Sequence, residues 1–112
     1  MVILRLELTE IGPMTAARFA GEGVSLDGAA TDMVRKELFT VADHLGGAEL
    51  SLDLSNIAFL HGTILGVLLM LSRRLHAAGQ QFWLVNPQPQ VAEVFRVAQL
   101  SALFEPPRQL AV

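Results

Sequence analysis

The sequence predicts a single α/β domain in which helices cover a mixed sheet. Apolar residues make up 52% of the 112 residues, enough to bury a core. Short runs that alternate apolar and polar residues indicate strands. Longer runs with a helical period separate the later strands, so the later strands are expected to run parallel. We expect about four to five strands, the first two forming an antiparallel hairpin, and about three to four helices.

The first half of the chain predicts the hairpin and one helix. Residues 2–8 and 14–20 have the composition of strands, with a turn at 10–13 between them, and the glycine-rich residues 21–28 indicate a loop. A helix is expected over 29–45, with Asp27 as its N-cap and two glycines at its end. One face of this helix carries Met33, Leu38, Val41, Ala42 and Leu45.

The second half alternates strand and helix. Leucines alternate with polar residues over 48–55, and the apolar character continues to residue 60. A helix is expected over 63–78, apolar on almost all sides in its first half. The remaining elements are expected to be a strand at 81–85, a helix at 89–98 that starts with a proline, and a short strand at 103–105. Residues 1–105 would form one domain, followed by a tail at 106–112.

Composition excludes several classes of function. The chain has no cysteine, so it has neither disulfides nor thiolate chemistry. Its net charge is −3 and its basic residues are not clustered, which disfavours nucleic acid as a partner. Residues 54–72 lack charge, but polar and turn-forming residues interrupt them, so we interpret them as strand, turn and buried helix rather than a membrane span. The N-terminus does not resemble a secretory signal, and we expect a cytoplasmic protein.

Catalytic and metal-binding signatures are not found in the sequence. His44, His61 and His76 are not spaced four residues apart, and no HExxH, GxSxG or phosphate-loop motif is present. Two of these histidines lie near the ends of expected helices, where the helix dipole accounts for them. Asp53 is expected to point outward from its strand. We therefore predict a protein that is not an enzyme and that needs no metal or cofactor.

The short segment His61-Gly62-Thr63 is the best candidate for a functional site. It joins the carboxyl end of a predicted strand to the start of a helix, where open α/β sheets place ligands. The first amides of a helix are unpaired and attract anions. Thr63 would either cap this helix or accept a phosphate group there, and Gly62 would allow close approach of another molecule. Local physics leaves both alternatives open.

The second half of the sequence resembles a known protein family. The segments "LDLSNIAFL", "LGVLL", "AAGQQFWLVNPQPQV" and "LSALFE", within residues 48–105, resemble the core of the STAS domain of bacterial anti-sigma factor antagonists. "GEGVSLD" at 21–27 resembles a lengthened form of the family's Gly-Glu-Leu-Asp loop. The resemblance implies a STAS-like mixed sheet and a protein that binds an anti-sigma factor, often a serine kinase. In this family the kinase phosphorylates a serine, and the added charge separates the partners.

The chain departs from the family pattern at the phosphorylation site. The family's Asp falls on His61 and its phosphoacceptor Ser on Gly62, which has no hydroxyl. Thr63 aligns with the following Ser or Thr and is a candidate substitute acceptor, although one residue of displacement turns a helical side chain by roughly 100°. The resemblance thus implies an interaction module without the usual switch. Its partner-binding loop would be His61, Gly62, Thr63, Ile64, Leu65 and Gly66, with Asp27 and Asp53 as further contacts.

Two other functions fit the same sequence. The chain would be a STAS subunit of a larger signalling assembly or of a transporter. It would also be able to form a homo-oligomer. Alternatively, it would bind a small ligand, a nucleotide or a lipid, through His61 and Thr63. Arg73 and Arg74 lie about three helical turns from that end and would not contribute to such a site.

Overall fold

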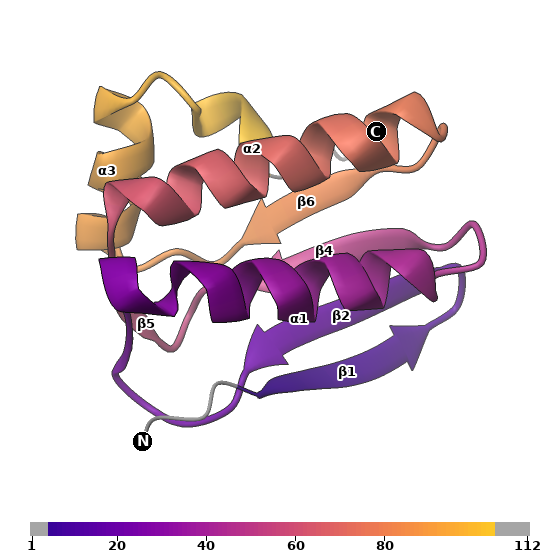
Figure 1. Cartoon of the computed structure of the whole chain (residues 1–112), viewed down its shortest axis with the longest axis horizontal. Helices are drawn as coiled ribbons and strands as arrows, with labels where there is room; N and C mark the ends of the chain where they lie inside the picture. The colour runs from indigo at the N-terminus through magenta and orange to yellow at the C-terminus, as the bar shows by residue number, and fades with distance from the viewer. Residues whose placement is uncertain (1–4, 105–112) are drawn as a thin grey trace, which may run out of the picture.

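The computed structural model describes residues 5–104 and is built around a four-stranded mixed sheet (Figure 1). The order of strands is β1-β2-β4-β6. Strand β1 is antiparallel to β2, whereas β2, β4 and β6 are parallel. The strands span Leu6–Ile11, Met14–Phe19, Glu49–Asp53 and Phe82–Val85. The predicted mixed sheet with an N-terminal hairpin is confirmed.

The hairpin has a tighter turn than the sequence pattern predicted. Ile11 pairs with Met14 around a two-residue loop, Gly12-Pro13, and Gly12 adopts a φ of 59°. The turn expected at 10–13 is therefore confined to these two residues, and the first strand continues to Ile11 instead of ending at residue 8. The pattern was misleading because β1 is exposed on both faces, so polar residues continue along it. Residues 1–4, where we expected the strand to begin, lie outside the described residues.

A second, two-stranded parallel sheet corrects two predictions. Residues 21–28, expected to be a loop, contain β3 (Val24–Leu26), which pairs with β5 (Ile57–Leu60). The apolar run from 48 to 60 is not one strand, because the chain turns at Ser55 and Asn56 between β4 and β5. The Asp53 carboxylate accepts the Ser55 N–H at 2.8 Å. The buried Asn56 amide donates to the backbone carbonyls of Phe19 and, at 2.7 Å, Gly21.

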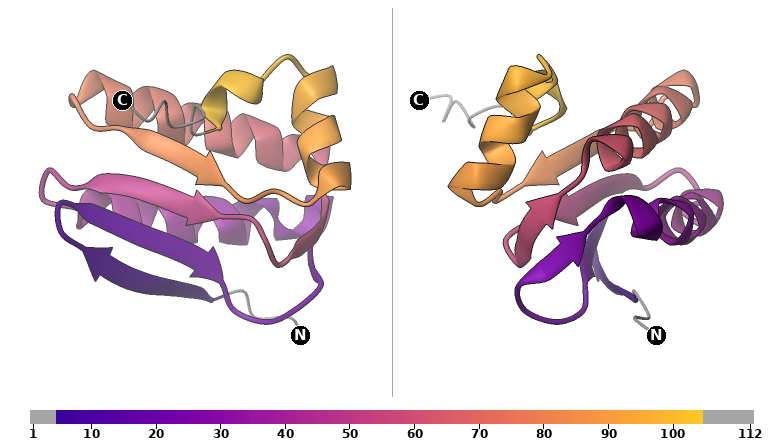
Figure 2. Two further views of the ribbon diagram at one scale, coloured as in Figure 1. Left: turned by 180° about the vertical axis from the view of Figure 1, so that it is seen from behind. Right: turned by 60° about the vertical axis from the view of Figure 1, so that its left-hand side comes forward.

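Two long helices lie side by side on one face of the main sheet, and a third packs against β5 (Figures 1 and 2). They are α1 (Thr31–Asp43), α2 (Gly62–Ala77) and α3 (Pro89–Val97). A 3₁₀ turn at Gly28–Ala30 precedes α1. Asp27 caps this turn by accepting the Ala30 N–H at 3.0 Å, so it is a cap, but not of the α-helix expected from residue 29.

The end of the described chain is a 3₁₀ turn at Ser101–Leu103 rather than a strand. Phe104 makes a single parallel bridge to Leu84 of β6, and its ring meets that of Phe95 edge to face with centroids 4.8 Å apart. This aromatic contact takes the place of a longer strand ladder. Glu105, the last residue of the strand expected here, and the tail at 106–112 lie outside the described residues.

The core fills the space between the main sheet and the helices. In α1 the fully buried side chains are Val34 and Leu38, while Met33 is half-buried, so the helix face is rotated slightly from the predicted one. The α2 residues Leu68, Leu71 and Leu75 are almost completely buried. Because these side chains anchor α2 over β4 and β6, the start of α2 is held at one edge of the molecule.

Asn56 is expected to be a key residue for stability. Replacing it with alanine would leave two backbone carbonyls without their donor, at a cost of about 1–3 kcal/mol in the free energy of unfolding. Urea titration of Asn56→Ala measures this. Ser55→Ala, in the same turn but exposed, should change stability much less. Equal stabilities of the two variants would contradict the assigned role of Asn56.

Candidate functional site

The segment between β5 and α2 lies beside the segment between β3 and α1. Strands β3 and β5 are parallel, with Leu26 opposite Leu60, so the two segments that follow them leave the small sheet at the same edge. The His61 N–H donates to the Leu26 carbonyl at 2.8 Å. The structure therefore brings Asp27 and Gly28 close to His61.

His61, and not Thr63, is the N-cap of α2. Its backbone is extended, with φ −75° and ψ 151°, and its Nδ1 accepts the Thr63 N–H at 3.1 Å. The helix begins at Gly62, one residue earlier than predicted, because the histidine ring caps it in the role that we considered for Thr63. Since Nδ1 is the acceptor, the proton of the neutral ring lies on Nε2.

Two threonine hydroxyls connect the starts of α1 and α2. The Thr31 hydroxyl donates to the Gly28 carbonyl at 2.8 Å, and its oxygen lies 2.7 Å from that of Thr63. Because the Thr31 proton points to Gly28, the Thr63 hydroxyl must donate to Thr31. Thr63 is exposed, yet its single hydroxyl proton is already used in a contact between the two helices.

The His61 ring completes this arrangement from the other side. Its Nδ1 lies 3.0 Å from the Thr63 hydroxyl oxygen. A Cβ atom added to Gly28 would lie 3.6 Å from the ring, so the ring packs over this glycine. The cap, the hydroxyl pair and the glycine thus lie in contact at the starts of the two helices.

The six residues predicted as a partner-binding loop divide into two groups. Ile64 and Leu65 are part of the core, being only 0% and 8% exposed. The other four, His61, Gly62, Thr63 and Gly66, are exposed. We call these four residues the junction surface.

Gly62 and Gly66 are glycines that the fold does not require. Neither has a positive φ, and a Cβ atom added at either position would meet no other atom within 4 Å. Glycine inside a helix is about 1 kcal/mol less favourable than alanine. The helix therefore carries a destabilising residue at Gly66 without a packing reason.

Sequence reasoning missed two exposed apolar side chains near this region. Phe59, in β5, is 50% exposed, and Met70, one turn beyond Gly66 in α2, is 55% exposed. The spacing of Gly62, Gly66 and Met70, four residues apart, places them on one side of a helix and was a usable signal. Phe59 gave no such signal, because alternation predicted it on the same face as the buried Ile57.

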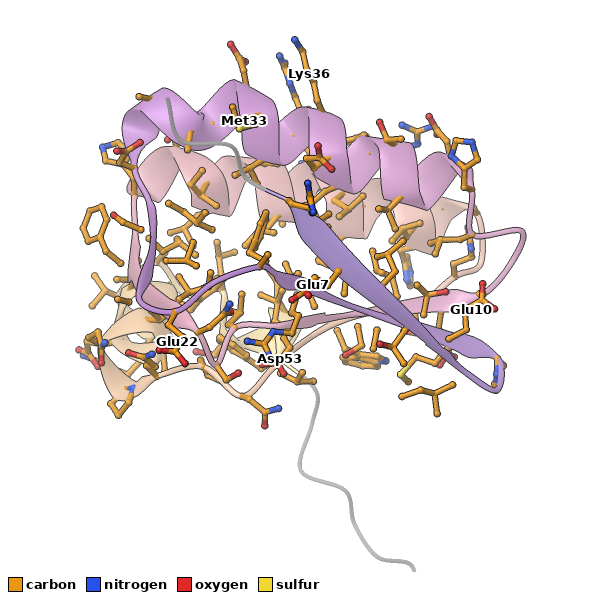
Figure 3. The ribbon with its side chains drawn as sticks, turned by 90° about the horizontal axis from the view of Figure 1, so that it is seen from below. Glu7, Glu10, Glu22, Met33, Lys36 and Asp53 are labelled. Atoms are coloured by element: carbon orange, nitrogen blue, oxygen red, sulfur yellow. The ribbon has the colours of Figure 1, made fainter. Side chains whose placement is uncertain are left out.

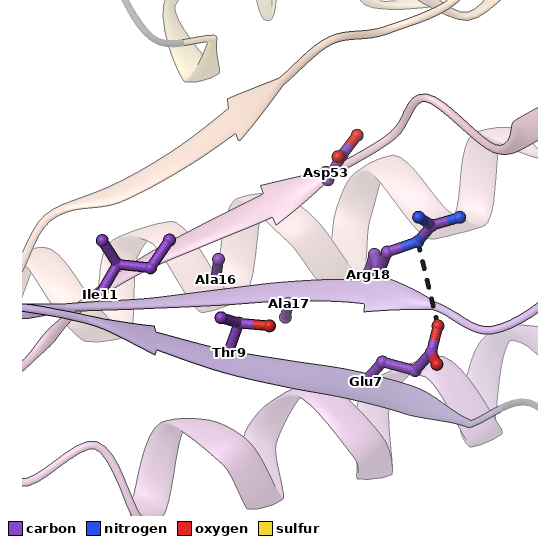
Figure 4. Close-up of a pocket in the computed structure, with 7 residues that line it drawn as sticks. All are labelled: Glu7, Thr9, Ile11, Ala16, Ala17, Arg18 and Asp53. Atoms are coloured by element: carbon purple, nitrogen blue, oxygen red, sulfur yellow. Dashed lines mark ion pairs between the residues drawn. The ribbon is translucent and has the colours of Figure 1, made fainter.

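Asp53 does not belong to the junction surface. It lies on the face of the main sheet away from the helices, near Glu7 (Figure 3). There it lines a hollow of about 400 Å³ with Glu7, Thr9, Ile11, Ala16, Ala17 and Arg18 (Figure 4). Arg18 Nε lies 4.0 Å from a Glu7 carboxylate oxygen. The two predicted partner contacts, Asp27 and Asp53, thus lie on different surfaces.

The described residues contain no group of three histidine or acidic side chains that could hold a metal ion. Within the same residues, none of the helices has the length and apolar character to cross a membrane.

On α3, a hydrogen bond from Arg96 lowers the pKa of the exposed Glu93 carboxyl, and the same bond raises the pKa of Arg96. This pair is a solvent-exposed helix contact and does not involve the junction.

Comparison with known families assigns the fold. The family model described as "Mlab, STAS domain" matches residues 14–105. The chain belongs to the STAS domain family. The match begins at the first residue of β2, so it includes the β3 and α1 segments that resembled the family only weakly in sequence.

Solved STAS structures are similar over nearly the whole chain. The unphosphorylated anti-sigma factor antagonist SpoIIAA of Bacillus is 21% identical, with a TM-score of 0.70, and the match covers 94% of this chain and 90% of SpoIIAA. A variant of RsbS from Moorella thermoacetica is 18% identical, with a TM-score of 0.61 and coverage of 96% and 84%. The murine Solute Carrier 26 family member A9 anion transporter is 24% identical, with a TM-score of 0.65; the match covers 86% of this chain and 17% of the transporter. No curated protein sequence matches the chain.

The cap gives a prediction for stability. His61→Ala removes the acceptor for the Thr63 N–H and should lower the free energy of unfolding by about 0.5–2 kcal/mol. His61→Asp restores a cap and adds a negative charge at the positive end of α2, so it should recover or exceed the original stability. Thermal unfolding of the three proteins provides the test. An alanine variant as stable as the parent would contradict the assigned cap.

Proposed function

We propose that this STAS domain is a non-enzymatic, cytoplasmic protein-interaction module that antagonises an anti-sigma factor without the usual phosphorylation switch. The observation that carries the proposal is the exposed glycine pair, Gly62 and Gly66, at the start of α2. These residues offer bare backbone to a partner, and nothing in the fold of the chain requires them.

The chemistry of the junction surface supports binding of a protein. Glycines on a helix surface let another backbone or a flat side chain approach closely. His61 and Thr63 beside them supply polar groups, and the half-exposed Phe59, in β5, and Met70, one turn beyond Gly66, supply apolar area. Partly apolar surfaces with a few polar groups are typical of protein interfaces.

The missing switch is supported by the residues at the junction. Gly62 has no hydroxyl to receive a phosphate. The Thr63 hydroxyl is engaged with Thr31 and lies beside Nδ1 of His61. A phosphate on Thr63 would break the contact between the starts of α1 and α2, even though the helix N-terminus itself favours a negative charge.

The absence of catalysis is proposed from the kind of residues at this edge. His61 Nδ1 lies 3.0 Å from the Thr63 hydroxyl oxygen, but this nitrogen caps the helix by accepting the Thr63 N–H, and the hydroxyl lies 2.7 Å from that of Thr31. Neither residue is arranged as an activated nucleophile, which requires a base oriented by a third group.

A phosphorylation experiment tests the missing switch. The chain, Gly62→Ser and Gly62→Ala are each incubated with the anti-sigma kinase and ATP, and phosphate is counted by intact mass. We expect phosphate on the serine variant alone. Stoichiometric phosphate on Thr63 of the unaltered chain would overturn the unswitched proposal.

The exposed glycines make a second, independent test available. Gly66→Ala should raise the free energy of unfolding by up to about 1 kcal/mol, because alanine favours a helix. The same substitution should weaken partner binding, and Gly66→Leu should weaken it further, by at least about tenfold, or 1.4 kcal/mol. Unfolding titrations and binding isotherms measure both effects.

Ala77→Leu is a matched control, since this residue is exposed at the other end of α2. It should leave partner affinity unchanged. If Gly66→Leu binds as tightly as the parent chain, the junction surface is not the interface.

A second candidate function is an accessory subunit of a transporter. The observation that favours it is the structural match to part of the murine anion transporter, in which the similar region is 17% of the chain. Affinity purification from detergent-solubilised membranes distinguishes the two, with Gly66→Leu as the control. Specific recovery of an ATPase-type kinase supports the antagonist, and recovery of a permease complex supports the transporter subunit.

A further inference from the structure

The main sheet has one covered edge and one bare edge. At the covered edge, Phe104 bridges to Leu84 of β6. At the other edge lies β1, which forms pairs within the described residues only with β2. All of its residues except the half-buried Leu6 are exposed, including Leu8 at 52% and Ile11 at 61%.

The free edge of β1 presents a row of backbone groups. Ile11 and Met14 close a two-residue loop, so they form a hydrogen-bonded pair, and such pairs alternate along an antiparallel ladder. The Ala20 N–H, which donates to the Arg5 carbonyl at 2.8 Å, follows the same alternation. Consequently, Leu6, Leu8 and Glu10 direct their N–H and C=O groups away from β2.

Of the features that protect an edge strand, β1 has two charged side chains, Glu7 and Glu10. Natural proteins protect such edges with lysine, proline, a bulge or a covering segment. From Leu6 to Ile11 the chain has no lysine or proline, and its register against β2 is continuous. An edge of this kind is suited to pairing with another strand.

There is room for the side chains of an added strand on both faces of β1. On the helix face, a hollow of about 200 Å³ separates Leu8 and Glu10 from Val41 and His44 of the α1 end. On the opposite face lies the larger hollow that Thr9 and Ile11 line (Figure 4). Side chains of a neighbouring strand alternate between the two faces and would lie beside these hollows.

We propose that β1 pairs with β1 of a second copy of this chain, antiparallel and with Leu8 opposite Leu8. The two sheets would join into one continuous sheet, with four strands from each copy. The helices of both copies would lie on the same face of it, because a two-fold axis perpendicular to the sheet relates them.

Charge selects this register. In the dimer, the outward-facing residues Leu6, Leu8 and Glu10 must pair with one another. The two-fold axis therefore passes through a residue of β1 and not between two residues. Centring on Glu7 or Glu10 would place like charges directly opposite each other, which is destabilising. Centring on Thr9 pairs only two of the three outward-facing residues, Leu8 with Glu10. Centring on Leu8 pairs all three, because Leu6 then lies opposite Glu10 and Leu8 opposite itself, with no like charges opposed.

The proposed dimer does not use the junction surface. Two junction surfaces would remain exposed, at opposite ends of the joined sheet, because the two copies are antiparallel. A partner with two binding sites would then bind with higher apparent affinity than to a monomer. This inference is therefore independent of the proposed function, and each can fail alone.

Cysteine crosslinking tests the register, since the chain has no cysteine of its own. Glu7 and Thr9 of the two copies would form a non-hydrogen-bonded pair with Cα atoms about 4.5 Å apart, within the roughly 4.4–6.8 Å range of disulfides. Mixed Glu7→Cys and Thr9→Cys chains should form a heterodimeric disulfide on mild oxidation. Each variant alone should crosslink much less, because its own copies would be about 7–8 Å apart diagonally.

Glu7→Cys mixed with Ala77→Cys is the control for random collision. A Glu7–Thr9 crosslink yield no higher than this control, or no higher than either variant alone, would overturn the proposed register.

Light scattering during gel filtration tests the association itself. The unaltered chain should be a dimer that dissociates on dilution. Leu8→Lys should be a monomer, because two lysines would face each other across the axis, and Met70→Lys should remain a dimer. A chain that is monomeric at every concentration, or a dimer that Leu8→Lys leaves intact, would overturn the proposal.

Discussion

The candidate site depends on the parallel pairing of β3 with β5. This pairing places Leu26 opposite Leu60, so two chain segments leave the small sheet at one edge. The His61 N–H then reaches the Leu26 carbonyl, and the two helices begin next to each other. Two strands this short would not be stable alone. Their buried leucines and the Asn56 side chain, which holds the end of β2, keep them in place.

The chain carries two surfaces that its own fold leaves unused. One is the junction surface, where glycine weakens a helix without a packing reason. The other is the free edge of β1, where a row of backbone groups has no partner among the described residues. They lie on different elements and share no residue, so the proposed binding of a partner at one surface does not exclude the proposed pairing with a second copy at the other.

The sequence was a good guide where periodicity reflects burial. The α2 run was predicted almost to the residue, because its apolar side chains must face the sheet and its flanking helices. Predictions failed where residues contact distant parts of the chain. Asp27 and Asp53 were both predicted as further partner contacts, and only the tertiary structure could tell that Asp27 lies beside the junction and Asp53 beside Glu7 and Arg18. Thr63 was one candidate for the cap of α2, and the His61 ring takes this role by accepting the Thr63 N–H.

Taken alone, the sequence determined the fold class, the order of most elements, the buried side of the helices and the absence of a serine at the family's phosphorylation position. These depend on local period and residue type, which are written along the chain. The tertiary structure decided which segments meet. Only it revealed that residues 24–26 form a strand, that Thr31 and Thr63 share a hydrogen bond, and that β1 is a bare edge. Such contacts join residues far apart in sequence, and no local pattern encodes them.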